Sequence, residues 1–426
     1  MRRFLKNFRV SKMLLCGLAV LLASALSGCQ AEPELPVVKL SVWGDERNQP
    51  LLEEALAEFK EEHRDEAIFE FTISMESELT CKETVLADPE SAADIYTFAD
   101  DQFEELWRAG ALLEITDSAE EIIKGVGGSS SGAAQASMRG GKLYAYPETA
   151  GNGYFLYYDS SYFTEDDVKS LDRILEIAAE NGKKFAMDFT SGWYIYSFFK
   201  GAGLDMYSDG NVNICNWNAS DTTYTGVEVV EAMLAVAKHD GFLSCNDAKF
   251  VEGIRDGSII AGVNGAWNAE YVLTALGEHY ETAKLPEYTL AGDSVQMCSF
   301  TGYKLMGVNA YTDYPEWAMK LGRYLNREEM QLKRFQQIGE CPANVNAAAS
   351  EEVKKSKAVA ALARQSQYGY TQNVEDPFWD GACLLGTTIA GGNCDDRDIQ
   401  ELLDKVTEMI TAPSRLAEGK ETSKTE

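Results

Sequence analysis

From residue 38 onward, strand-like and helix-like hydrophobic periodicities alternate along this chain, and this pattern restricts its fold more than any other feature. Val38, Leu40 and Val42 alternate with polar residues as in a half-buried strand, whereas the apolar residues that follow recur at helical spacing. The expected elements are a strand over 38–42, a helix over 51–59, strands over 69–75 and 94–98, and a helix over 103–107 that Gly110 ends. Strands that alternate with helices of this length predict an α/β fold with mostly parallel sheets flanked by helices.

The alternation of strand-like and helix-like patterns continues to about residue 265, and mainly helices are expected from Pro315 onward. We expect two consecutive aromatic-rich strands over 141–148 and 153–159, a helix opened by Thr164 and Asp167 at capping-box spacing, a strand over 183–189, a helix over 224–239 and a strand over 258–265. The glycine- and serine-rich stretch 124–134 is typical of a surface loop. From Pro315 onward, apolar residues at helical spacing predict helices over 315–337, 351–366 and 396–411.

The N-terminal 28 residues have the composition of a secretory signal peptide. Five Arg and Lys residues precede an apolar stretch over 13–26, which is too short to span a bilayer as a helix. This stretch runs into Leu26-Ser27-Gly28-Cys29, which resembles the bacterial lipobox, where the cysteine is lipidated and becomes the mature N-terminus. We therefore expect a lipid on Cys29 to anchor the chain to the membrane, with residues 29–37 as a tether. The alternative is a plain secretion signal with an incidental cysteine.

Charge and composition limit the partners of the chain. The formal net charge is −30, which argues against nucleic acid as a partner and favours a neutral or cationic ligand over a phosphate. Outside the leader and Cys29, seven cysteines are scattered without a C-x-x-C pair, so we expect free thiols instead of a disulfide framework. The three histidines are equally dispersed, and we expect no metal site and no cofactor.

The motifs single out no catalytic residue. The stretch Gly128-Ser129-Ser130-Ser131-Gly132 satisfies G-x-S-x-G, but a nucleophile elbow needs a buried strand before it and a helix directly after it. Here the charged end of a helix runs into a glycine-rich stretch, which indicates a linker. Phosphate-binding glycine signatures are absent, and the many acidic residues define no carboxylate pair.

Large aromatic residues stand where strands end, helices begin or loops run, which are the positions from which an α/β fold presents ligand contacts. These residues are Trp43, Phe98, Trp193, Tyr194, Trp267 and Trp379. For each of them, packing in the core is an equally good explanation, because large aromatic side chains are commonly buried.

Several stretches, taken in order, resemble the sugar-binding branch of bacterial extracellular solute-binding proteins, and most closely the maltose/maltodextrin-binding proteins of ABC importers. The matching stretches are KLSVWGDE, ADIYTFADDQFEELWRAGALLEIT, GKLYAYPETAGNGYFLYYD, FVEGIRDGSIIAGVNGAWNAEYV, GYKLMGVNAYTDYPEWAMKLGRYL and DPFWDGACLL. Each stretch is weak alone, but together they cover essentially the whole mature chain in the family's order. The ordered set is specific for the family and less specific for the ligand.

The resemblance implies two α/β lobes that are joined by hinge strands and close over a ligand. The chain is then expected to cross between the lobes near Thr149, Ser299 and Ser350. Lobe 1 would consist of 38–149 plus 300–350, lobe 2 of 150–299 plus 351–412, and 413–426 would be a polar tail.

The resemblance also implies a set of ligand-binding residues. Trp267 and Trp379 fall on the family's stacking tryptophans. Trp193 and Tyr194 fall on an aromatic pair that lines the sugar subsites, and Asp101 falls on an acid that accepts hydrogen bonds from sugar hydroxyls. A pyranose has an apolar face that stacks on an aromatic ring and a rim of hydroxyls that needs polar partners. The other expected ligand contacts are Trp43, Asp45, Glu46, Arg47, Phe98, Gln102 and Asn152.

Some positions depart from the maltodextrin-binding pattern. Phe98 stands where a tryptophan is common, Gln102 and Cys383 replace basic residues, and Gly151 or Asn152 replaces an acidic one. The stacking aromatic residues persist while polar contacts change. The resemblance therefore implies carbohydrate as the ligand class, with maltose or maltooligosaccharide-like chains expected first.

We therefore expect a monomeric lipoprotein without enzymatic activity, which captures an oligosaccharide and delivers it to the transmembrane subunits of an ABC permease. Its location would be the extracytoplasmic face of the cell membrane, and the lipid anchor suggests a Gram-positive source. Two alternatives stay open at this point. One is a surface-anchored glycoside hydrolase, which the same aromatic and acidic residues would suit, and the other is a sugar sensor that reports to a membrane kinase.

Overall fold

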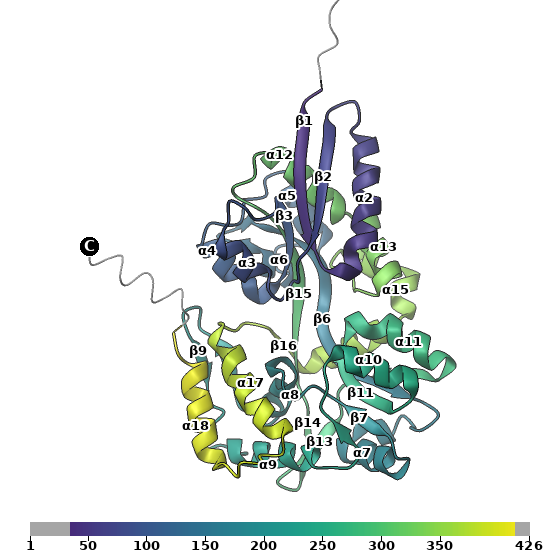
Figure 1. The fold of residues 1–426 in the computed structure, drawn as a ribbon, viewed down its shortest axis with the longest axis vertical. Coiled ribbons are helices and arrows are strands. Elements are labelled where there is room, and N and C mark those ends of the chain that lie inside the picture. Colours follow the sequence, from purple (N-terminus) through teal and green to yellow (C-terminus); the bar gives the residue numbers. More distant parts are fainter. Residues whose placement is uncertain (1–34, 414–426) are drawn as a thin grey trace, which may run out of the picture.

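The computed structural model describes residues 35–413 (Figure 1). The predicted signal peptide, Cys29 with most of the tether, and the polar tail after residue 413 lie outside the described residues. Within the described range, no helix combines the length and the apolar character that crossing a membrane requires.

A ten-stranded sheet runs through the molecule in the order β10-β7-β11-β6-β15-β3-β1-β2, with β12 added to β6 and β16 added to β15. Its strands are β1 (Val37–Gly44), β2 (Ile68–Met75), β3 (Ile95–Ala99), β6 (Ala145–Asp159), β7 (Lys184–Ala186), β10 (Phe242–Leu243), β11 (Ile259–Gly265), β12 (Tyr280–Ala283), β15 (Ser299–Val308) and β16 (Gly369–Thr371). β1 pairs in parallel with β2 and β3, and β7 pairs in parallel with β10 and β11. The central pairs β15–β3, β15–β6, β6–β11 and β6–β12 are antiparallel, so parallel pairing is concentrated toward the two ends.

β6 and β15 connect the two ends of the sheet, as Figure 1 shows. The first half of β6 pairs with β15 as far as Gly153, and its second half pairs with β11 and β12 from Tyr154 onward. The prediction of two separate strands over 141–148 and 153–159 was wrong. Gly151 adopts a left-handed φ of 76°, and two register shifts interrupt the pairing with β15, so the irregular residues are absorbed within one continuous strand.

Helices cover both ends of the sheet and create two lobes with separate hydrophobic cores (Figure 1). Around β1, β2 and β3 lie α2 (Gln49–Glu62), α3 (Cys81–Ala87), α4 (Phe103–Arg108), α5 (Ala119–Gly125), α6 (Gly132–Ser137), α12 (Pro315–Leu325) and α13 (Glu328–Ile338). Around β7, β10 and β11 lie α7 (Leu171–Glu180), α8 (Gly192–Gly201), α9 (Gly226–Ala237), α10 (Asp247–Asp256), α11 (Ala269–Leu276), α16 (Lys357–Gln365), α17 (Pro377–Ala390) and α18 (Ile399–Ile410). The predicted two-lobed α/β fold is confirmed, while the predicted lobe boundaries stay a prediction.

Most predicted elements agree with the structure within a few residues, but the predicted helix over 315–337 is divided into α12 and α13, and that over 351–366 into α15 (Glu351–Lys355) and α16. Other differences concern the region around Thr164, the stretch 124–134 and α17. Thr164 and Asp167 exchange backbone-to-side-chain hydrogen bonds of 2.9 and 3.2 Å, but they close a turn, and α7 begins later with Ser170 as its cap. The stretch 124–134 is not a loop throughout, because α5 ends within it and α6 begins within it. α17 had no predicted counterpart, although its buried Phe378, Ala382, Leu385 and Ile389 recur at helical spacing.

Candidate functional site

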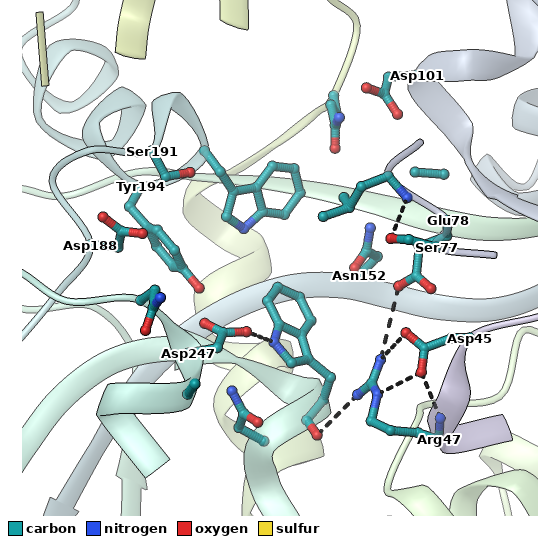
Figure 2. Close-up of a pocket in the computed structure, with 18 of the residues that line it drawn as sticks. Asp45, Arg47, Ser77, Glu78, Asp101, Asn152, Asp188, Ser191, Tyr194 and Asp247 are labelled. Carbon is teal, nitrogen blue, oxygen red and sulfur yellow. Dashed lines mark hydrogen bonds and ion pairs between the residues drawn. The ribbon is translucent and has the colours of Figure 1, made fainter. Parts of the chain in front are cut away.

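A cleft of about 860 Å³ lies where the two lobes face each other. Lobe 1 lines it with the segments that follow β1, β2 and β3, and lobe 2 with the segments that follow β7 and β11 and the first turns of α8, α10 and α17. The carboxyl ends of parallel strands are the common position of ligand sites in α/β folds. Here the parallel strands of both lobes end at the same cleft, whose lining side chains are drawn in Figure 2.

Most of the residues predicted to bind a ligand gather along this cleft. Nine of the twelve line it: Asp45, Arg47, Asp101, Gln102, Asn152, Trp193, Tyr194, Trp267 and Trp379. They come from both lobes and from segments far apart in the chain. Their contact with a ligand stays a prediction.

Three of the predicted residues do not line the cleft. Phe98 is completely buried in the core of lobe 1, where its ring packs near that of Tyr96 at 6.0 Å between centroids. Trp43 packs against the same core, and Glu46 is exposed in the short 3-10 helix after β1. The strand β3 is buried on both faces, so its sequence carries no polar alternation that would have assigned Phe98 to a side.

Gln102 lines the cleft but has a local structural task. Its Oε1 accepts a hydrogen bond from the backbone N–H of Lys82 at 3.0 Å, and its Nε2 donates to the carbonyl oxygen of Glu78 at 2.6 Å. The amide therefore holds the segment after β2 that carries Ser77, Glu78 and Leu79 into the cleft. A basic side chain could donate to the carbonyl but could not accept from the N–H.

The turn after β1 joins the two lobes across the cleft. Asp45 caps this turn by accepting from the backbone N–H of Arg47 at 2.8 Å, and its carboxylate also accepts from Arg47 Nε at 3.1 Å. Arg47 Nη1 donates to the backbone carbonyl oxygen of Trp267 at 3.3 Å, as Figure 2 shows. A residue from the segment after β1 is thus hydrogen-bonded to a residue from the segment after β11.

A buried ion-pair cluster continues from Arg47 into lobe 1. Lys304 on β15 lies 2.6 Å from Glu78 and 2.7 Å from Glu340, and Arg47 lies 3.7 Å from Glu340. Burial alone would raise the pKa of Glu340, but Lys304 and Arg47 outweigh it and lower the pKa. Burial alone would lower the pKa of Lys304, but the two carboxylates raise it. The cluster therefore remains charged and ties the strand β15 to the cleft.

The tryptophans of the cleft differ from a core tryptophan. Trp193, Trp267 and Trp379 are partly exposed along the cleft, whereas Trp217 is completely buried. Trp267 Nε1 donates to the Asp247 carboxylate at 2.6 Å, which holds its ring in place (Figure 2). Trp193 packs edge-on against Tyr154 with 5.6 Å between centroids. Partly exposed, fixed indoles offer flat apolar surfaces to a ligand.

Several buried polar atoms of the lining lack a hydrogen-bond partner among the described residues. They are Glu78 Oε2, Asp101 Oδ1, Trp193 Nε1, the Tyr194 hydroxyl and Gln372 Oε1. A buried polar atom without a partner costs free energy, so such atoms are rare unless a ligand or water completes them. The set contains acceptors and one N–H donor, which suits a ligand rich in hydroxyl groups. No group of His, Cys, Asp and Glu residues in the described part of the chain is arranged to hold a metal ion.

Asp101 gives the protein a pH-dependent stability. Burial raises the pKa of its carboxyl to about 6, although Lys82 opposes the shift. The folded protein then binds this proton more tightly than the unfolded chain, in which aspartate titrates near a pKa of about 3.9. The charged carboxylate therefore destabilises the fold above pH 6, and the penalty disappears as the pH falls toward about 4. As the pH falls from about 6 to about 4, we expect the free energy of unfolding of the wild type to increase relative to that of Asp101→Asn. Urea titrations at several pH values would measure this change. A difference between the two proteins that stays constant with pH would contradict this expectation.

Sequence reasoning missed several residues that line the cleft. The main ones are Ser77, Glu78, Asp188, Ser191, Asn246, Asp247, Asn268, Tyr271 and Gln372. Part of the signal was present, because Asp188 and Ser191 follow β7 directly, and Asn268 and Tyr271 follow Trp267 after β11. Glu78 likewise follows β2 closely, whereas Asp247 and Gln372 follow no strand that the sequence predicted.

Comparison with known proteins agrees with this geometry. The family described as "Bacterial extracellular solute-binding protein" matches residues 54–361. The galactooligosaccharide-binding protein of Bacillus subtilis (strain 168) is 25% identical over 391 residues, which cover 87% of this chain and 88% of that protein.

Solved structures show the same fold. A protein solved with acarbose has a TM-score of 0.75 at 28% identity, with 88% of this chain and 98% of that chain covered. The maltodextrin-binding protein from L. casei BL23, solved without ligand, has a TM-score of 0.72 at 22% identity, with 88% and 99% covered. The family match spans more than half of the chain, and the relatives in question bind ligands without being enzymes. The chain therefore belongs to the bacterial extracellular solute-binding proteins, a family of binding proteins and not of enzymes.

Proposed function

We propose that the chain binds an oligosaccharide in the cleft between its lobes and delivers it to the permease of an ABC importer. One observation carries the proposal: partly exposed tryptophans and unpartnered buried polar atoms line the same cleft. The flat apolar face of a pyranose stacks on an indole, and its hydroxyl groups complete carboxylates, amides and hydroxyls. A cleft with both features therefore offers contacts to the apolar face of a sugar ring and to its hydroxyl groups.

The names of similar proteins support an oligosaccharide over a monosaccharide. The curated relative binds a galactooligosaccharide, and one structural neighbour was solved with acarbose. The cleft of about 860 Å³ lies within the range of small-molecule sites and has room for more than one sugar ring. Maltooligosaccharide-like chains stay our first expectation, and the relative adds galactooligosaccharides to the ligands worth testing.

Titration of the full mature protein with maltooligosaccharides and galactooligosaccharides tests this function. We expect saturable binding, a decrease of the radius of gyration in small-angle scattering as the lobes close, and no shortened sugar products. The decrease should be absent with a sugar that does not bind, such as a monosaccharide at the same concentration. Failure of both oligosaccharide classes to bind would contradict the proposal.

We further propose that a lipid on Cys29 holds the protein at the extracytoplasmic face of the cell membrane, where it works as a monomer beside its permease. The lipobox-like stretch that ends at Cys29 supports this anchor. Anchoring would keep the captured sugar close to the transporter in a cell without an outer membrane.

The anchor predicts the fate of a single variant. Cys29→Ala should either be released into the medium or remain unprocessed, whereas the wild type should fractionate with membranes and incorporate a fatty-acid label. Cys394→Ala, which changes an exposed thiol near the other end of the chain, should behave as the wild type. An unlabelled wild type, or a Cys29→Ala variant that stays on the membrane, would count against the anchor.

A further inference from the structure

The charges of the cleft are strongly unbalanced. Among the described residues, its lining contains one cationic side chain, that of Arg47, and five carboxylates: Asp45, Glu78, Asp101, Asp188 and Asp247. Arg47 is already engaged by Asp45 at 3.1 Å and by Glu340 at 3.7 Å in lobe 1. Arg47 therefore does not neutralise the carboxylates on the lobe 2 side of the cleft. A neutral sugar would not neutralise them either.

Asp188 and Asp247 are the carboxylates of the lobe 2 wall. Asp188 accepts hydrogen bonds from the backbone N–H and the hydroxyl of Thr190, at 2.9 and 2.6 Å. Asp247 accepts from Trp267 Nε1 at 2.6 Å and from Asn264 Nδ2 at 3.1 Å. All four donors are uncharged, and within the described residues neither carboxylate has an ion-pair partner. The wall therefore keeps two negative charges.

Tyr194 supplies an independent sign that a ligand group belongs on this wall. Its side chain is only 4% exposed and lines the cleft, yet its hydroxyl has no hydrogen-bond partner among the described residues, because the neighbouring backbone N–H of Gly265 donates to Asn264 Oδ1 at 2.7 Å instead. Figure 2 shows its ring close to both Asp188 and Asp247. Burial raises the pKa of Tyr194, and both carboxylates add to this shift, which places all three groups in one electrostatic environment. A group with several donors would satisfy the three acceptors together.

We propose that Asp188, Tyr194 and Asp247 bind a protonated amine, so that an oligosaccharide that carries an amino sugar binds more tightly than its neutral counterpart. The inference rests on the proposed function and names the class of sugar. An ammonium group supplies three donors and a positive charge, whereas a hydroxyl supplies one donor and no charge. The partly exposed indoles of Trp193 and Trp267 add aromatic faces, which attract cations. Lys249, the cation nearest to Asp247 along the chain, is exposed and does not pair with either carboxylate.

A pair of trisaccharides that differ only in the amine provides the test. The glucosamine trimer carries an amine at the position where cellotriose carries a hydroxyl, and the two share the same linkage. By calorimetry at about pH 5, where the amine is protonated even though the neighbouring sugar oxygens lower its pKa below that of a lysine side chain, we expect the glucosamine trimer to bind at least about tenfold more tightly. The advantage should shrink as salt is added, because salt screens the attraction between charges.

Two variants test whether the charge of Asp188 causes the difference in affinity between the two trisaccharides. Asp188→Asn should reduce the ratio of the two affinities by about tenfold or more, because it removes one charge from the wall while keeping the side-chain shape. Asp221→Asn, which makes the same change at an exposed position of lobe 2 outside the cleft, should keep the wild-type ratio. Midpoints of urea unfolding for both variants would show that each remains folded.

The possible outcomes separate this inference from the proposed function. If maltotriose or a galactooligosaccharide binds while the glucosamine trimer binds no better than cellotriose, the amino-sugar inference is overturned and the proposed function stands. If no oligosaccharide of any of these classes binds, both are overturned. An unchanged affinity ratio in Asp188→Asn would mean that the wall accepts sugar hydroxyls only, and would overturn the assignment of the amine to this wall.

Discussion

Replacing Trp267 with alanine is expected to weaken oligosaccharide binding by about 1–3 kcal/mol, or about 5- to 150-fold in Kd. The ring stands in the cleft after β11, and its Nε1 is held by the Asp247 carboxylate at 2.6 Å. Because the indole is oriented before the ligand arrives, stacking costs little additional side-chain freedom. The free energy of unfolding should fall much less than the roughly 3–5 kcal/mol expected for a tryptophan removed from a core. Calorimetry and urea unfolding of the same preparation measure the two quantities.

Trp217→Ala is the matched control for this prediction. Trp217 is completely buried and stacks on Phe199 with 4.1 Å between ring centroids, and it does not line the cleft. This variant should lose about 3–5 kcal/mol of stability while its folded fraction binds the oligosaccharide as the wild type does. The assignment of Trp267 to the site would fail if Trp267→Ala showed this second pattern, with a large loss of stability and near-native affinity.

Lys304→Met is expected to lower the free energy of unfolding by about 3–5 kcal/mol. The ammonium group of Lys304 is buried on β15 and lies 2.6 Å from Glu78 and 2.7 Å from Glu340. Methionine has a similar length but no charge, so the two carboxylates would lose their nearest cation and keep only the weaker interactions with Arg47 and Arg334. Urea unfolding followed by tryptophan fluorescence measures the loss. The loss should diminish toward about pH 4, because protonation would then neutralise the unpaired carboxylates.

An exposed ion pair supplies the reference for this variant. Lys39→Met removes the partner of Glu70 at 3.0 Å, but the Lys39 side chain is 67% exposed. Water screens this pair, so its loss should change the stability far less than the loss of the buried Lys304 does. Similar small effects of both substitutions would contradict a stabilising role for the buried cluster.

The α/β class and most elements of lobe 1 were predictable because local patterns determine them. Alternation over residues 38–42 and helical spacing over 51–59 correspond to β1 and α2, since one face of each element is buried and the other is solvated. The continuous β6 was not predictable in the same way. Pro147, Gly151 and Gly153 are residues that commonly interrupt a strand, so the sequence predicts two strands here. The pairing with β15 keeps β6 continuous across them.

The cleft was predictable to the extent that strand ends define it. Trp267 after β11 could be singled out because residues that follow parallel strands converge at one edge of a sheet, whereas Asp45 after β1 was implied by the family resemblance. Phe98 does not line the cleft, and the sequence could not have shown this, because β3 is buried on both faces and offers no alternation to choose between them. Asp247 and Gln372 reach the cleft through tertiary packing, and neither a predicted strand end nor a motif marks such residues in a single sequence.

The pairing of β3 with β15 also determines when this protein can fold during synthesis. β3 ends at Ala99, but its antiparallel neighbour begins only at Ser299, so the first lobe lacks a central strand until most of the chain has left the ribosome. Contacts between segments so distant in sequence form slowly, because a long loop must close before they are made. A nascent chain of this topology stays unfolded for longer than one built from neighbouring strands.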